Sequence, residues 1–132
     1  MDRSPGEDLF VYGTLAPASP EEARRRGASA DAVRGRLFDL GPYPALVDLD
    51  DPTADWVAGH VFRVDEAALA GPLDDYEGVK RGPYRRERTT SRSGRTVWVY
   101  IFAGPLPATA RGPILRWEGP RVDLEALTGP AG

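Results

Sequence analysis

The sequence predicts a small α+β protein in which a mixed sheet curls into a barrel-like shape, accompanied by short helices. About six short apolar runs alternate with turns that are rich in glycine and proline. Several of these runs are apolar on both faces, so both faces of the corresponding strands need a cover. Helix-start signals are few by comparison. A sheet with these properties is expected to close on itself and to leave a ligand site at its mouth.

The length and composition fit one domain. The chain has 132 residues, of which 41% are hydrophobic, enough for a single packed core. We expect one domain over residues 1–132, with its core over about 9–103 and a tail at 104–132 that carries little pattern. The N-terminus is polar, and no run approaches the roughly 18 apolar residues of a membrane span. A cytoplasmic location is therefore the default expectation.

Residue usage limits the chemistry that the chain can perform. There is no cysteine, which excludes disulfides, thiolate metal sites and a cysteine nucleophile. Lys80 is the only lysine and His60 the only histidine, so a Schiff base or a histidine-dependent triad would need those residues. His60 lies within an apolar alternation, where a structural role is the commoner one. The net charge of −3 argues against a dedicated nucleic-acid binder.

Turn and helix signals divide the chain into elements. Strands are expected at 9–12, 31–41, 44–47, 56–64, 85–90 and 96–102, and the proline that opens 44–47 indicates an edge strand. In 56–64 the larger apolar residues share one face. Ser19 and Pro20 have the N-cap and first-turn pattern of a helix. Short helices are also expected at 66–70, at 73–77 before Gly78, and at 122–127, and the turn at 91–94 predicts a hairpin.

Two motifs are candidates for function. Tyr12-Gly13-Thr14-Leu15 follows the first strand, and a glycine there lets backbone N–H groups face an anion. An ordinary turn explains the same pattern. Asp74-Asp75-Tyr76-Glu77-Gly78 places three carboxylates in the last turn of an expected helix, where the helix dipole disfavours negative charge. Asp74 and Asp75 are interpreted as solvent-facing, whereas Glu77 remains open between a structural and a functional role.

The strand after these carboxylates is basic, with Arg85, Arg86 and Arg88 in succession around Glu87. A solvated outward face is the commoner explanation for such a strand. A patch for an acidic partner is the second one.

Six segments together resemble the γ-glutamylcyclotransferase-like fold family, close to its AIG2-like and γ-glutamylamine cyclotransferase branches. The segments that carry the resemblance are Phe10–Leu15, Gly35–Leu37, Tyr43–Leu46, Gly59–Phe62, Leu73–Gly78 and Tyr84–Arg86. Their order extends over about 9–103. The family fold is a compact mixed-sheet barrel with short helices, as the residue pattern also predicts. The chain departs from many relatives after Leu15, where Ala16-Pro17-Ala18 replaces a basic residue and a glycine.

The resemblance implies an enzyme with Glu77 as its catalytic acid/base. It implies that Tyr12, Gly13, Thr14 and Leu15 form the loop that holds the glutamyl end of a substrate. Tyr84 matches a tyrosine that lines such pockets, and Tyr100 is a further candidate for substrate binding.

The implied reaction closes a γ-glutamyl amide to 5-oxoproline and releases an amine. The attacking α-amine and the γ-carbonyl belong to one molecule, so no enzyme nucleophile, metal or cofactor is needed. We expect a small-molecule γ-glutamyl amide as partner, and neither nucleic acid nor membrane. The competing hypothesis is a non-catalytic binding module that uses the same pocket or the basic strand. The sequence leaves the released amine and the oligomeric state open.

Overall fold

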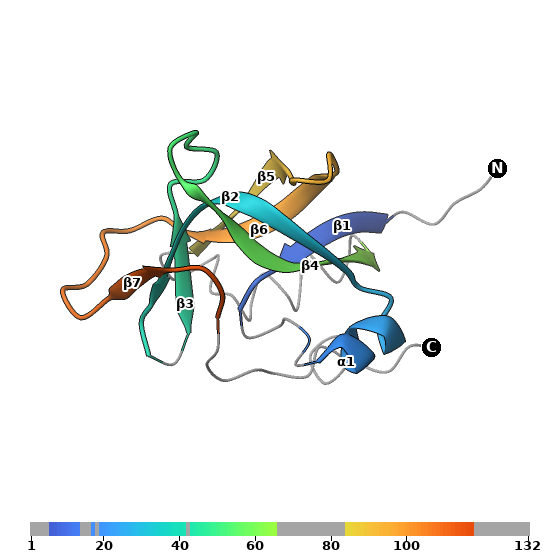
Figure 1. Ribbon diagram of the computed structural model, residues 1–132. Coiled ribbons are helices and arrows are strands. Elements are labelled where there is room, and N and C mark those ends of the chain that lie inside the picture. Colours follow the sequence, from blue (N-terminus) through green and yellow to red (C-terminus); the bar gives the residue numbers. More distant parts are fainter. Residues whose placement is uncertain (1–5, 14–16, 18, 42, 66–83, 118–132) are drawn as a thin grey trace.

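The computed structural model describes residues 6–13, 17, 19–41, 43–65 and 84–117 (Figure 1). It contains one short helix and seven strands in these ranges. In chain order they are β1 (Gly6–Val11), α1 (Pro20–Arg25), β2 (Ser29–Asp39), β3 (Pro44–Val47), β4 (Asp55–Asp65), β5 (Tyr84–Thr90), β6 (Thr96–Phe102) and β7 (Arg111–Ile114). The helices predicted at 66–70, 73–77 and 122–127 lie outside the described residues. Within those ranges, no helix has the length and apolar character that crossing a membrane requires.

The strands form one mixed sheet in the order β3-β2-β4-β1-β6-β5, and β7 pairs with β2 off this path. β1 and β6 run parallel, and the other pairs are antiparallel. The two ends of the order approach each other, because β3 also contacts β6. Figure 1 shows the resulting curl, in which β2 and β4 cross over β1 and β6. The predicted mixed sheet with a half-barrel curl is confirmed.

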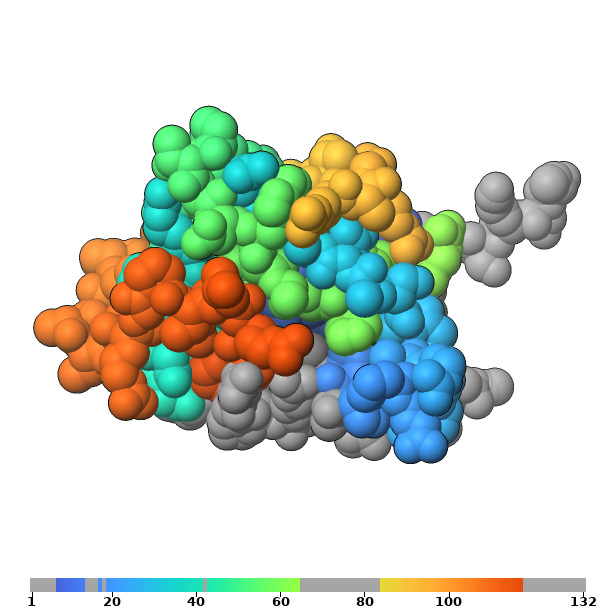
Figure 2. All heavy atoms as spheres, viewed as in Figure 1, coloured from blue at the N-terminus to red at the C-terminus, as the bar shows by residue number. Residues whose placement is uncertain are grey.

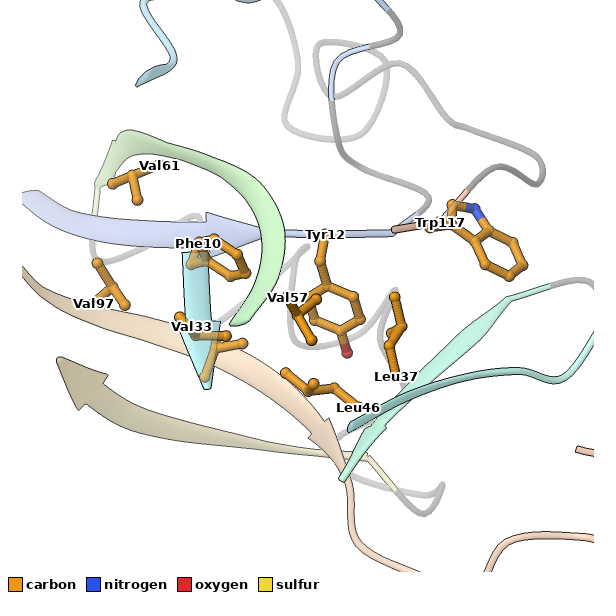
Figure 3. Packing of buried hydrophobic residues seen from close by; sticks show 10 residues of the cluster. Phe10, Tyr12, Val33, Leu37, Leu46, Val57, Val61, Val97 and Trp117 are labelled. Carbon is orange, nitrogen blue, oxygen red and sulfur yellow. The ribbon is translucent and has the colours of Figure 1, made fainter. Parts of the chain in front are cut away.

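The core lies inside the curl of the sheet. It is built mainly from aliphatic residues of β2, β3, β4 and β6, together with Phe10 and Tyr12 at the end of β1. Figure 3 shows the Tyr12 ring among these aliphatic side chains. Residues 9–12 are all at most 7% exposed, so β1 is covered on both faces. This result confirms the prediction from its uninterrupted apolar run.

Helix α1 begins as its sequence predicts. Ser19 is the N-cap, and its hydroxyl accepts a hydrogen bond from the Glu22 backbone N–H at 3.1 Å. Pro20 occupies the first helical turn, where its missing N–H costs nothing. Arg26, at the C-cap, pairs with Glu22 at 2.9 Å and places its guanidinium 5.3 Å from the Phe62 ring centroid. The helix end is thereby held against β4.

Two features of the sheet differ from the sequence expectation. β4 buries residues of both faces: Val57 and Val61, each 1% exposed, belong to the central cluster, and Phe62 at 4% and Val64 at 9% are buried on the other face, where Trp56 is only half-buried. The larger apolar residues therefore do not mark a single core face in this strand. The second feature is strand β7, which the sequence pattern does not predict because the tail is rich in glycine and proline.

The chain after β7 contributes to the core. Trp117 is 2% exposed and belongs to the central cluster. Just before it, the Leu115 carbonyl accepts a hydrogen bond from the Ala58 backbone N–H at 3.3 Å. Figure 2 shows the orange-red chain from β7 onward lying against green residues of the middle of the chain. Residues 111–117 therefore belong to the packed domain.

The β5–β6 hairpin is tied to β2 by one carboxylate. Asp31 accepts hydrogen bonds from the Ser91 and Ser93 hydroxyls, both at 2.7 Å, and from the Ser93 backbone N–H at 3.1 Å. Burial opposes the charge of Asp31, but these bonds and one from the Ala32 backbone N–H outweigh it and lower its pKa. The hairpin predicted at 91–94 is present, and Gly94 supplies its positive φ of 93°.

Candidate functional site

The sheet topology brings the described candidate residues to one end of the sheet. β1 and β6 are parallel, so their carboxyl ends point the same way. β5 is antiparallel to β6, and its first residue Tyr84 pairs with Phe102. Residues that follow β1, end β6 and begin β5 are consequently neighbours. They include Tyr12, Gly13, Tyr84 and Tyr100, which are far apart in the sequence.

Tyr12 links β1 to β6. Its hydroxyl donates a hydrogen bond to the Tyr100 backbone carbonyl, and its ring stacks on Phe10 with centroids 6.3 Å apart. Tyr12 is 7% and Tyr100 3% exposed. The Tyr12 side chain thus anchors the start of the 12–15 turn in the core. Because the side chain is buried, the predicted substrate binding by this motif would use the backbone of the residues that follow Tyr12.

Gly13 lies directly against Pro44 at the start of β3. A Cβ atom at position 13 would come within 2.6 Å of Pro44 Cγ, closer than real Cβ contacts. The Pro44 carbonyl in turn accepts a hydrogen bond from the Tyr84 hydroxyl at 2.7 Å. Pro44 therefore joins two predicted site residues that are 71 positions apart (84 − 13) in the sequence.

Tyr84 is the centre of an aromatic cluster that consists of Tyr43, Tyr84 and Phe102. Its ring meets Tyr43 edge-on at a centroid distance of 6.2 Å and Phe102 edge-on at 5.3 Å. Such arrangements match the quadrupoles of aromatic rings and hold the rings in defined orientations. Tyr43 remains 50% exposed. The cluster therefore borders the Gly13 turn and presents one ring to solvent.

Three predicted site residues lie outside the described part of the chain. They are Thr14 and Leu15 in the turn, and Glu77, the predicted acid/base. Along the chain, Glu77 precedes Tyr84 by seven residues (84 − 77). Tyr84 is the first described residue after Glu77, and both Tyr84 and Gly13 contact Pro44.

Sequence reasoning missed Pro44, Tyr43 and Phe102 as parts of this region. The sequence uses Pro44 as an edge-strand signal, which its terminal place in the sheet order confirms, and Tyr43–Leu46 as one segment of the family resemblance, without a site role for either residue. An aromatic residue next to a proline in a turn was the available signal for Tyr43. Phe102 had none, since it ends an apolar strand in which every residue is expected to pack.

The basic strand β5 is engaged within the protein. The Arg86 and Arg88 guanidiniums lie over the Trp98 ring at 4.5 and 4.3 Å from its centroid. Glu7 accepts hydrogen bonds from Trp98 Nε1 at 3.0 Å and from Arg88 at 3.3 Å. These contacts of Arg86, Arg88 and Glu7 with Trp98 cover the outer face of β6. They agree with the interpretation of β5 as an outward-facing charged strand.

A second charged network closes the loop between β3 and β4. Arg36 bonds Asp48 at 3.0 Å and Asp51 at 2.9 Å, which raises the pKa of the arginine. Asp51 accepts from the Thr53 backbone N–H, from Arg36 and from the Thr53 hydroxyl, and these bonds lower its pKa from 3.8 to about 2. Its oxygens are thus occupied by partners of this loop. Among the described residues, no group of acidic or histidine side chains has the arrangement of a metal site.

The comparisons with known proteins agree with this architecture. The model of the family described as gamma-glutamyl cyclotransferase, AIG2-like, matches residues 9–118, and the chain belongs to this family. The match includes β7 and Trp117, beyond the range of about 9–103 that the motifs cover. No curated protein matches the chain significantly.

Solved structures share the fold at low identity. An AIG2-like protein from Mus musculus is 24% identical with a TM-score of 0.61, over 78% of this chain and 81% of that one. A protein specific to uropathogenic E. coli is 16% identical with a TM-score of 0.59, over 80% and 86%. A protein from Pyrococcus horikoshii is 17% identical with a TM-score of 0.54, over 91% of both chains. At these identities the likeness concerns the fold alone.

Proposed function

We propose that the protein is a γ-glutamyl cyclotransferase, which converts a γ-glutamyl amide into 5-oxoproline and a free amine. The observation that carries the proposal is the junction of Gly13, Pro44 and Tyr84. It joins the turn expected to hold the glutamyl end to the strand that follows the Glu77 segment in the sequence. Membership of the cyclotransferase family supports the same reaction class.

Turn 12–15 would bind the substrate through its backbone. Gly13 has no Cβ, and its close contact with Pro44 fixes one side of the turn. The backbone N–H groups of the turn would be the donors for a ligand's carboxylate or developing oxyanion. Tyr12, held through its hydroxyl on Tyr100, would keep this turn in place at the end of β1.

Glu77 would move the proton. Its carboxylate takes a proton from the substrate α-ammonium, and the freed amine attacks the γ-carbonyl to form the ring C–N bond. The tetrahedral intermediate then collapses, the amide C–N bond breaks, and the proton held by Glu77 passes to the leaving amine. The ring nitrogen, which is cationic after the attack, loses a second proton, and this proton leaves with the amine as its ammonium form. One carboxylate can carry these protons in sequence. Because the attacking amine and the carbonyl belong to one molecule, the enzyme has to supply little of the free energy that orients the reacting groups.

The proposal is tested by incubating the purified protein with a panel of γ-glutamyl amides and measuring 5-oxoproline release. The panel should include amides of amino acids, of polyamines and of simple alkyl and aromatic amines. Release of 5-oxoproline from one or more members, with stoichiometric amine, is the expected result. Binding of an amide without any turnover would instead favour the non-catalytic module.

A further inference from the structure

We propose that Tyr43 is a specificity-determining residue that binds the leaving-amine side of the substrate and selects amides of apolar or aromatic amines. This inference rests on the proposed function and adds the substrate class. It concerns the aromatic cluster of Tyr43, Tyr84 and Phe102, which borders the Gly13 turn and is only partly buried.

The position of Tyr43 follows from three successive contacts. Gly13 touches the Pro44 ring, and the Pro44 carbonyl accepts the Tyr84 hydroxyl hydrogen bond at 2.7 Å. The Tyr84 ring then meets the Tyr43 ring at 6.2 Å between centroids. Because Tyr43 also precedes Pro44 in the chain, these contacts form one compact group beside Gly13, and Tyr43 is its most exposed ring. With the glutamyl end in the 12–15 turn, the group on the other side of the scissile amide would lie against this ring.

The backbone and the neighbouring rings hold Tyr43 in place although its side chain is 50% exposed. Its carbonyl accepts a hydrogen bond from the Leu40 N–H at 3.1 Å, which closes the turn between β2 and β3. An exposed ring on a fixed backbone loses little conformational freedom when a ligand covers it. Tyr43 therefore has the exposure and the order that a binding surface needs.

The chemistry of the cluster favours an apolar amine. The three rings meet edge-on, and the Tyr84 hydroxyl is engaged with the Pro44 carbonyl. An alkyl or aromatic group gains by covering Tyr43, since apolar area leaves water. A leaving group that carries charges, such as the α-ammonium and α-carboxylate of the lysine in ε-(γ-glutamyl)lysine, would lose hydration there and recover only a cation–π contact.

The test compares wild type with Tyr43→Ala on γ-glutamyl benzylamide, γ-glutamyl methylamide and ε-(γ-glutamyl)lysine. In Tyr43→Ala the ratio of kcat/KM for benzylamide over methylamide should fall roughly tenfold, mainly through KM, because the contact is remote from the reacting carbon. Tyr43→Phe should keep the ratio, because the ring provides the contact. Leu115→Ala removes the other large exposed apolar side chain of the described residues and should leave both rates unchanged.

The outcomes separate the inference from the function on which it rests. An active Tyr43→Ala enzyme with an unchanged benzylamide-to-methylamide ratio overturns the role of Tyr43 and leaves the cyclotransferase proposal standing. An equal loss on the lysine amide overturns the apolar selection. A wild-type protein that turns over none of the three amides, nor any other of the panel, removes the proposed reaction and this inference with it.

Discussion

Gly13 and Pro44 touch so closely that any side chain at position 13 would force one of them to shift: a Cβ atom there would lie 2.6 Å from Pro44 Cγ. The contact holds the turn after β1 against the first residue of β3. These two strands are not neighbours in the sheet order, so the contact is a product of its curl. It makes the geometry of the turn sensitive to both side chains.

Gly13→Ala should reduce both stability and activity. The added methyl group must displace the rigid proline ring, and overpacking of this kind costs about 1–3 kcal/mol of unfolding free energy. Urea denaturation measures this loss. Pro44→Ala makes room for the methyl group, so Gly13→Ala should cost less in that background than in wild type. Equal costs in the two backgrounds would contradict the contact.

Tyr84→Phe tests the bond that links β5 to β3. The variant keeps the ring in the aromatic cluster but removes the hydroxyl that donates to the Pro44 carbonyl at 2.7 Å. A loss of about 0.5–1.5 kcal/mol in unfolding free energy is expected, the usual net value of one such bond. Tyr43→Phe is the matched control, because this exposed ring should leave the unfolding free energy within about 0.5 kcal/mol. A Tyr84→Phe protein as stable as wild type would argue against the bond.

Glu77→Gln tests the proton transfer. Glutamine keeps the shape and hydrogen-bonding capacity of glutamate but cannot exchange a proton with the substrate. Turnover of the best amide should fall by at least roughly 10²–10⁴-fold, the usual contribution of general acid–base catalysis. Substrate binding, measured by calorimetry, should survive because the Gly13 turn is unchanged.

Asp75→Asn provides the matched control for this change. Asp75 belongs to the same acidic run and is interpreted as facing solvent. The Asp75→Asn enzyme should therefore turn over substrate nearly as fast as the wild type. A fully active Glu77→Gln enzyme would exclude Glu77 as the acid/base. Loss of activity in both variants would instead show that the run matters as a unit.

Asp51 should make stability depend on pH in the acid range. Hydrogen bonds from the Thr53 N–H, Arg36 and the Thr53 hydroxyl lower its pKa from 3.8 to about 2. The folded state thus binds this proton less readily than the unfolded chain does. The resulting stabilisation is fully present above pH 3.8 and is lost as the pH falls toward about 2.

The measurement is the urea midpoint of wild type and Asp51→Asn at pH 6 and pH 2. The wild type should have the higher midpoint at pH 6, and the difference should shrink at pH 2. Thr53→Ala keeps the backbone N–H and Arg36 as partners of Asp51, so it should retain part of this pH dependence. A difference that is the same at both pH values would show that the charge of Asp51 does not contribute.

Local patterns determined most elements of this fold. The uninterrupted apolar run of β1, the N-cap pair Ser19 and Pro20, the hairpin with Gly94 and the opening proline of β3 each have one favourable local structure. Such signals depend on neighbours in the chain, so the sequence contains them completely. The same holds for the motif order that indicated the family, which the family match confirms. The choice of site residues, which are Glu77, the 12–15 turn, Tyr84 and Tyr100, stays a prediction from sequence.

Only the tertiary structure decided which distant residues meet. The curl of the sheet buries Val57 and Val61 in the central cluster as well as Phe62 and Val64 on the other face of β4, and it draws Trp117 into the core. It also sets Pro44 between Gly13 and Tyr84, and Tyr43 at the rim. These contacts depend on how strongly a sheet bends and which strands its ends approach. That geometry is set by the packing of the whole core, which no single stretch of the chain encodes.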